Sequence, residues 1–439
     1  MKRALSYIVA LLALCCCCSR TESVPLKQMT VIAPGHFHAA LTQKTPLPGV
    51  GDTVHVFAPE GVELQTYLKT VASYTDPETG SSRWVEKVYA GEDYLEKVPP
   101  AQSGCFVVLA GNNKLKSRYI LESVRKGYHV LADKPMAISR EDLLLLDTAY
   151  HEASERGLVI CEMMTERYDL LNKIVKELVA DQELFGVCQR VKMLSVHHFY
   201  KEVSGVPVRR PAWYFDVTQQ GEGIADVTTH LIDQIFWICS PAAPVTADRV
   251  VLKEASRWTT PLSMEQFRQV TGESVIPSFL ADYVRGDSLE VSANGRMSFM
   301  LDQIPCDIEV HWDYVAPEGA GDISVCRYTG SRATLEIVQD AETGFVRQLF
   351  LTAPYAEAAS AVARLKADFP FVHLQDDGEG RFLLDVPLKE RSGHEEHFGL
   401  VARAFLHQVD EALMSDEESA NTLTKYKLTI DAVSAATMR

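Results

Sequence analysis

The most informative stretch of this sequence is Lys126-Gly127-Tyr128-His129-Val130-Leu131-Ala132-Asp133-Lys134-Pro135, a short apolar run that ends in a carboxylate, a lysine and a proline. A similar run precedes it, Val107-Val108-Leu109-Ala110-Gly111-Asn112-Asn113, and a helical pattern over 115–125 lies between the two. Short apolar runs separated by a helix predict parallel strands joined by a right-handed crossover.

The same alternation extends outward over residues 29–168. We expect strands at 31–33, 54–57, 85–89, 106–110, 129–131 and 158–161, and a further helix at 140–155 that begins after a Ser139 cap. Most of these runs are apolar throughout, as in strands that are covered on both faces. The pattern predicts a Rossmann-type, doubly wound α/β domain.

Beyond about residue 184 the strand-like runs become longer and follow one another without helices. They lie at 186–197, 288–292, 307–312, 323–328, 333–338 and 347–352, and helices are expected at 222–239, 395–413 and 419–437. Consecutive strands of this kind predict a large, mostly antiparallel sheet in an α+β domain. We therefore divide the chain into a signal segment 1–18, a linker 19–28, a dinucleotide-type domain 29–168 and an α+β domain 169–439.

The charge balance points to a small molecule as the main partner. The chain has 43 Lys and Arg against 59 Asp and Glu, a formal net charge of −16, and no block of basic residues. Nucleic acid is excluded as the main partner, because phosphate contacts need clustered cations. After the N-terminus no apolar run approaches the roughly 20 residues that span a bilayer, so a polytopic membrane protein is excluded as well.

The N-terminus resembles a lipoprotein export signal. Lys2 and Arg3 precede an apolar stretch over 4–14, and four cysteines follow at 15–18. A cysteine at the end of such a core can be lipidated, and Cys17 or Cys18 fits better than Cys15, which follows the bulky Leu14. A cleaved secretory signal and a short uncleaved anchor are the alternatives. All three place the body outside the cytoplasm, in the periplasm or at the outer membrane.

The two strand-end motifs resemble those of the Gfo/Idh/MocA family of NAD(P)-dependent oxidoreductases, which act mainly on sugars and polyols. In that family a Glu-Lys-Pro motif ends the fifth strand and its lysine lies beside the nicotinamide; here Asp133 replaces the glutamate. The resemblance implies a cofactor site that includes Gly111, Asn112, Asn113, Asp133, Lys134 and Pro135. It covers nearly the whole chain after residue 28, and the C-terminal half resembles the subgroup with an oxidoreductase C-terminal domain, frequent in Bacteroidetes.

The first strand-to-helix turn is the weakest part of the resemblance. In Thr30-Val31-Ile32-Ala33-Pro34-Gly35-His36-Phe37-His38 only Gly35 remains of three glycines that let the backbone approach a pyrophosphate. His36, Phe37 and His38 are expected to flank the cofactor. Glu60, after the second strand, is expected to accept the ribose hydroxyls, and no Lys or Arg follows it until Lys69, which favours NAD over NADP.

Two further segments extend the resemblance to the substrate side. Cys161-Glu162-Met163-Met164-Thr165-Glu166-Arg167-Tyr168 places Glu162 near the cofactor and Arg167 and Tyr168 near the sugar, and Trp213 is a further expected sugar contact. Gly221 to Asp233 contains the family's D-x-x-x-H, in which a four-residue step puts Asp226 and His230 on one helical face. The expected roles are His230 as base, Lys134 as the cation that stabilises the alkoxide, and Asp226 as the residue that orients His230 or binds a neighbouring hydroxyl.

No catalytic metal is expected, because the histidine pairs 36/38, 197/198 and 394/397 lack a third ligand at zinc spacing. The remaining six cysteines are scattered and read as small buried residues.

The extracytoplasmic location shapes the expected function, because free NAD is scarce there and the cofactor has to be tightly retained. We expect an oxidoreductase that forms keto-sugars from a sugar or glycoside, and a homo-oligomer. The alternatives are a redox-neutral, NAD-dependent glycoside hydrolase and a non-catalytic carbohydrate-binding lipoprotein.

Overall fold

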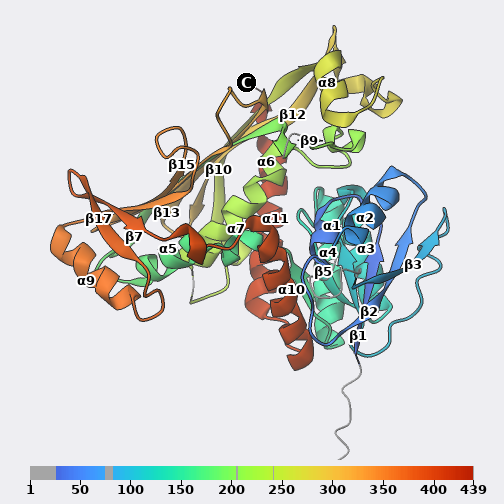
Figure 1. Cartoon of the computed structure of the whole chain (residues 1–439), viewed down its shortest axis with the longest axis horizontal. Helices are drawn as coiled ribbons and strands as arrows, with labels where there is room; N and C mark the ends of the chain where they lie inside the picture. Colours follow the sequence, from blue (N-terminus) through green and yellow to red (C-terminus); the bar gives the residue numbers. More distant parts are fainter. Residues whose placement is uncertain (1–25, 75–82, 204–205, 241, 439) are drawn as a thin grey trace, which may run out of the picture.

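A computed structural model describes residues 26–74, 83–203, 206–240 and 242–438 (Figure 1). The signal segment 1–18, with Cys17 and Cys18, lies outside the described residues. No helix in the described parts of the chain combines the length and the apolarity that a membrane crossing requires.

The first sheet is parallel and has the strand order β3-β2-β1-β4-β5-β6. Its strands are β1 (Lys27–Ile32), β2 (Val50–Ala58), β3 (Val85–Ala90), β4 (Phe106–Leu109), β5 (His129–Ala132) and β6 (Ile160–Glu162). The helices that connect them are α1 (His38–Leu41), α2 (Val62–Ala72), α3 (Lys116–Arg125) and α4 (Arg140–Glu155), and Ser139 caps α4 as predicted. The predicted Rossmann-type domain is confirmed. Because the strand order reverses between β1 and β4, their carboxyl ends flank the ligand crevice typical of such sheets.

The second sheet has eleven strands and is mostly antiparallel, which confirms the predicted α+β half. Its long central strands are β7 (Cys188–Tyr200), β10 (Val250–Ser263), β12 (Ser288–Leu301), β13 (Ile304–Val315) and β14 (Ile323–Gly330). Toward one edge follow β15 (Thr334–Gln339), β16 (Gln348–Thr352), β18 (Arg381–Asp385) and β17 (His373–Gly378). Two pairs among the described strands of this sheet are parallel: β7 with β13, and β10 with the short β19 (Thr437–Met438).

The two C-terminal helices, α10 (His394–Glu411) and α11 (Asp416–Ala435), return to the first domain and lie between the two sheets (Figure 1). Phe398, Val401 and Phe405 of α10 belong to the same apolar core as β1 and β2. Tyr426 and Ile430 of α11 pack with β4 and β5. Leu428 and Ala432 of α11 lie in the core of the second domain, so α11 packs against both domains, whereas α10 packs into the core of the first.

Candidate active site

Three cavities meet at the carboxyl ends of β1, β4 and β5. The inner cavity, about 520 Å³, lies between Lys134 and the face of β7, β13 and β14. The nucleotide-side cavity, about 300 Å³, lies between the ends of β1, β2 and β4. The outer cavity, about 880 Å³, opens between α2 and the segment 208–219. Trp213 lines all three cavities, so they surround one side chain.

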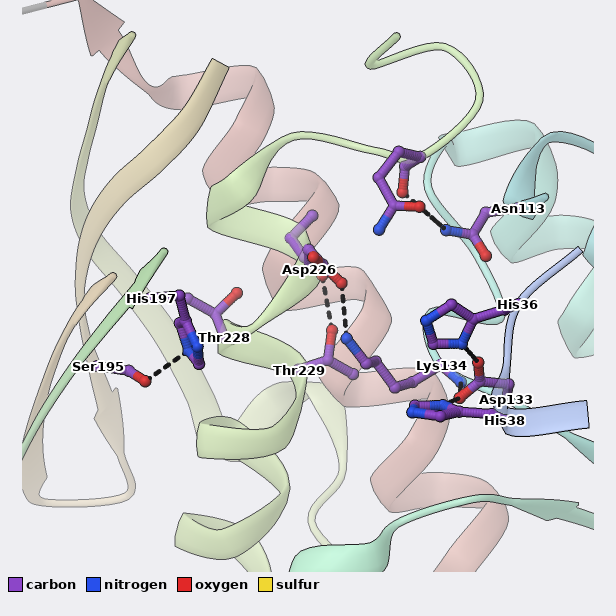
Figure 2. A network of polar contacts seen from close by, with 12 residues as sticks. His36, His38, Asn113, Asp133, Lys134, Ser195, His197, Asp226, Thr228 and Thr229 are labelled. Carbon is purple, nitrogen blue, oxygen red and sulfur yellow. Dashed lines mark hydrogen bonds and ion pairs between the residues drawn. The ribbon is translucent and has the colours of Figure 1, made fainter. Parts of the chain in front are cut away.

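Two oppositely charged side chains in the wall of the inner cavity form an ion pair. Lys134 Nζ, just after β5, donates to Asp226 Oδ1 at 2.7 Å, and both side chains are largely buried (Figure 2). Burial acts to raise the pKa of Asp226, but the ammonium of Lys134 outweighs it and the pKa is lowered. The carboxylate is therefore ionised and holds the lysine in place.

Asp226 reaches this position because two glycines let its helix pass close to a strand. The predicted helix over 222–239 is interrupted at Val227, giving α6 (Gly223–Asp226) and α7 (Thr228–Cys239). A Cβ on Gly223 would lie 1.7 Å from the carbonyl oxygen of Ala293 on β12, and one on Gly295 would lie 2.5 Å from Cβ of Ile224. The backbone of α6 thus packs directly on the sheet. Val227 keeps helical dihedral angles, so Asp226 and His230 still share a face.

His230, in the first turn of α7, lines the same cavity. Burial, and secondarily the charge of Lys134, hold its pKa well below the ordinary histidine value. Its Nδ1 is buried and has no hydrogen-bond partner among the described residues. A buried polar atom without a partner is unusual and points to a ligand. His230 is therefore a neutral imidazole in the inner cavity.

His36 and His38 converge on Asp133, so these two histidines have a potential third ligand that their spacing along the chain does not predict. His36 Nδ1 lies 2.9 Å from Asp133 Oδ2, and His38 Nδ1 lies 3.0 Å from Oδ1 (Figure 2). Sequence spacing missed this group because Asp133 comes from a different strand. Burial lowers the pKa of His38 to about 3. Burial acts to raise the pKa of Asp133, but the two histidines outweigh it and the pKa of Asp133 lies well below its usual value.

His36, His38 and Asp133 have the spacing of a potential metal site. Their potential ligand atoms lie within 4.8 Å of one another, a spacing that a metal ion could use. The two hydrogen bonds already satisfy both carboxylate oxygens, and the ammonium of Lys134 lies close enough to lower the pKa of His38. That a metal takes no part stays a prediction.

The first turn keeps its shape although two glycines are missing. Ala33 stands at the first glycine position and adopts φ 46°, the left-handed conformation that usually favours glycine. Gly111, after β4, allows this turn to approach, since a Cβ there would lie 2.3 Å from the carbonyl oxygen of Ala33. The backbones of the two turns therefore pack directly on each other, and together they line the nucleotide-side cavity, a backbone cradle at the place where such sheets bind a pyrophosphate.

A segment of the second domain closes over this cradle. Asn112 Nδ2 donates to Gln219 Oε1 at 2.7 Å, and the backbone N–H of Asn113 donates to the carbonyl oxygen of Gln219 at 3.0 Å. Beneath them Lys116 Nζ donates to Asn113 Oδ1 at 2.5 Å, and burial lowers the pKa of this lysine to about 8. Sequence reasoning missed Lys116, which carries no motif signal.

Four predicted site residues lie elsewhere. Arg167 binds Asp233 at 2.7 and 2.8 Å and Glu418 at 2.6 Å, and Glu162 pairs with Lys425, so both serve a buried ionic cluster between the domains. Neither of these residues nor Tyr168 lines the three cavities. Glu60 is exposed and lines none of them; the carboxylate of the nucleotide-side cavity is Glu63, in the first turn of α2.

The other predicted residues lie at or beside the three cavities. Gly35, His36 and Phe37 line at least one of them, as do His38, Gly111, Asn112, Asn113, Asp133 and Trp213. Pro135 is buried beside Lys134.

The arrangement of domains and strand-end motifs defines a Gfo/Idh/MocA-type protein. Residues 174–437 match the family model described as "Putative oxidoreductase C terminal domain". The match covers more than half of the chain, and the chain belongs to this family.

Solved structures and curated relatives agree with this assignment. A structure described as that of a putative oxidoreductase from Parabacteroides merdae is 35% identical, with a TM-score of 0.90 over 94% of this chain and 98% of that chain. The 3-ketoreductase KijD10 from Actinomadura kijaniata, solved with NADP and TDP-benzene, shares the fold at 12% identity, with a TM-score of 0.59 over 94% and 98% of the two chains.

Glucose-6-phosphate 3-dehydrogenase of Bacillus subtilis is 27% identical over 158 residues, 35% of this chain and 41% of that protein. The chain spans about half the length of the curated relatives it matches.

Proposed function

We propose that this protein is an NAD-dependent oxidoreductase that oxidises a secondary hydroxyl of a sugar or glycoside. The observation that carries the proposal is the convergence of Lys134, Asp226 and a neutral His230 on one cavity beside the backbone cradle of Gly35 and Gly111. The names of a 3-ketoreductase and a sugar-phosphate dehydrogenase among the similar proteins support a sugar as substrate.

The chemistry assigns separate roles to three side chains. A bound nicotinamide supplies the hydride acceptor. Neutral His230 accepts the hydroxyl proton, and the ammonium of Lys134 stabilises the negative charge that develops on the oxygen. Asp226 keeps Lys134 charged and oriented. The hydrogen bond from Asn112 to Gln219 holds the segment around Gln219 over the cradle. This closure supports a cofactor that stays bound between turnovers.

The direct test is product analysis on a panel of sugars and glycosides, with the protein as purified. A keto-sugar supports the proposal. Released aglycone without net redox change would instead identify a glycoside hydrolase, for which the outer cavity beside the site provides space. Binding without any product would identify a carbohydrate-binding protein.

We expect a preference for NAD(H) over NADP(H), because Glu63 places a carboxylate in the nucleotide-side cavity, where a 2′-phosphate would meet it. Glu63→Gln should improve NADP(H) binding by about tenfold and leave NAD(H) binding within a few-fold, a difference of roughly 1.4 kcal/mol. Calorimetric titration with both cofactors measures this. Lys114 is the cation that lines the same cavity, so Lys114→Ala should weaken NADP(H) and serves as the opposite control. Equal or tighter binding of NADP(H) by the unaltered protein contradicts the expectation.

We expect the pH dependence of kcat/KM to reflect a histidine with a lowered pKa. His230 can act as a base only while it is unprotonated, so the rate falls when the pH drops below its pKa. Burial and the charge of Lys134 hold the pKa of His230 well below the ordinary histidine value. Oxidation should therefore show no acid limb near pH 6.5, and the limb should lie at clearly lower pH. A limb at or above about 6.5, the ordinary histidine value, would show that another group titrates.

We also propose that the protein is a lipid-anchored protein outside the cytoplasm, on the basis of its N-terminal sequence. In its native host it should be found in membrane fractions and be released when Cys15 to Cys18 are replaced by Ser. Cytosolic protein that keeps its first residues contradicts this.

A further inference from the structure

Arg210 differs from the other cations that line the inner cavity. The cavity wall contains four Lys and Arg side chains, and three are paired with carboxylates: Lys134 with Asp226 at 2.7 Å, Lys201 with Asp322, and Arg347 with Glu166 at 3.2 Å and Asp169 at 3.1 Å. Within residues 26–74, 83–203, 206–240 and 242–438, Arg210 forms no ion pair with a carboxylate. The remaining acid of the wall, Asp133, is buried and occupied by His36 and His38.

The guanidinium of Arg210 is held in a fixed position. It lies 4.8 Å from the centre of the Tyr214 ring and 4.9 Å from that of Trp312. Its Nε donates to the carbonyl oxygen of Phe199 at 3.2 Å and its Nη2 to that of His198 at 3.3 Å. Backbone carbonyls and ring faces fix the orientation of the cation without neutralising its charge. The N–H groups of the planar guanidinium form a fork that is pre-organised for an oxyanion, because little side-chain freedom remains to be lost on binding.

The position of Arg210 relates it to the reacting groups. Arg210 and Tyr214 line both the inner and the outer cavity, so Arg210 stands where the two cavities join. Burial, together with the neighbouring Asp226, raises the pKa of Tyr214. The ring of Tyr214 contacts the guanidinium of Arg210, and Tyr214 lines the inner cavity together with Lys134 and Asp226. A ligand with a hydroxyl at Lys134 and His230 can extend past Tyr214 toward the guanidinium.

We propose that Arg210 binds an anionic substituent of the substrate, a carboxylate or a phosphate, so that the preferred substrate is an acidic sugar. This rests on the proposed oxidation of a sugar. The role of Arg210 is recognition: its charge selects the substrate and orients it with the reacting hydroxyl toward Lys134.

The test uses binding rather than turnover. NAD-loaded protein is titrated calorimetrically with glucuronate, glucose 6-phosphate and glucose, which differ in the anionic group. At least one of the two anions should bind ten-fold or more tightly than glucose, and the comparison between them identifies a carboxylate or a phosphate. Arg210→Gln should remove this advantage, weakening the preferred anion by about 10-fold to 100-fold while glucose binding stays within about twofold.

Two further variants sharpen the result. Arg209→Gln is the matched control, since Arg209 lines only the outer cavity and donates to the carbonyl oxygens of Arg268 and Gln269; it should keep the preference for the anion. Arg210→Lys keeps the charge but loses the fork, and should bind the anion several-fold more weakly than the parent. If Arg210→Gln does not fold, the affinity of Arg210→Lys for the anion tests the proposal instead.

The proposal is overturned if glucose binds as tightly as both anions, if Arg210→Gln weakens all three ligands equally, or if Arg210→Lys binds the anion with undiminished affinity. Selective anion binding that depends on Arg210, without oxidation of any member of the sugar and glycoside panel, would refute the proposed function and leave the anion site in place.

Discussion

His230→Ala should lower turnover by about 100-fold to 10,000-fold, the usual contribution of a positioned acid-base group, and leave NAD affinity nearly unchanged. The reason is geometric: His230 lies on α7 of the second domain, with a neutral imidazole facing the inner cavity rather than the backbone cradle. Steady-state kinetics on the oxidised sugar and calorimetric titration with NAD separate the two effects.

Lys134→Ala provides the contrast. Lys134 follows β5 of the nucleotide domain and is paired with Asp226, so its loss should reduce turnover and also weaken NAD binding by about tenfold, as expected for a charged contact. His407→Ala, an exposed histidine of α10 paired with Glu411, is the neutral control. Loss of cofactor binding alone in both variants, or ordinary activity of His230→Ala, would falsify the assignment of the D-x-x-x-H helix.

Lys425→Ala should strongly destabilise the protein. The side chain of Lys425 is 1% exposed, and its ammonium donates to Glu162 at 2.6 Å and to Asp233 at 3.0 Å. Its removal leaves two buried carboxylates close together without this cation, and breaking a buried pair in this way costs about 3–5 kcal/mol. The midpoint of urea unfolding should fall markedly.

Lys427→Ala is the matched control for this variant. Lys427 lies two residues away on the same helix, pairs with Asp431, and is 52% exposed, so its removal should change stability by less than about 1 kcal/mol. Similar unfolding midpoints for Lys425→Ala and Lys427→Ala would show that the buried cluster does not hold the domains together.

The elements predicted correctly are those in which the local pattern and the final burial agree. The strands around Val107 and Val130 are fully buried, and the helix after Ser139 has its cap within its own sequence. β10 was missed because most of its residues are partly or fully exposed, so its sequence shows no clear alternation. The break at Val227 was missed because it depends on contact between Gly223 and a distant strand.

In the candidate site, too, residues with a local sequence motif were predicted and residues placed by distant contacts were not. Lys134, Asp226 and His230 carry sequence motifs, and the structure brings them to one cavity. Other features of the site depend on contacts between distant segments. Asp133 pairs with both histidines, and Arg167 lies between Asp233 and Glu418. Among the four described cations that line the inner cavity, Arg210 is the one without a carboxylate partner. Spacing along the chain contains no signal for such contacts.

The return of the last two helices to the first domain has a consequence for the order of folding. Lys27 at the start of β1 pairs with Asp410 of α10, 383 residues later, and Phe405 lies in the same core as β1 and β2. During synthesis the nucleotide-binding half thus lacks part of its apolar core until the C-terminal helices have emerged. Contacts of such long sequence separation form slowly, because loop closure must precede them. The first half of the chain therefore reaches its final packing only after the last helices have been synthesised.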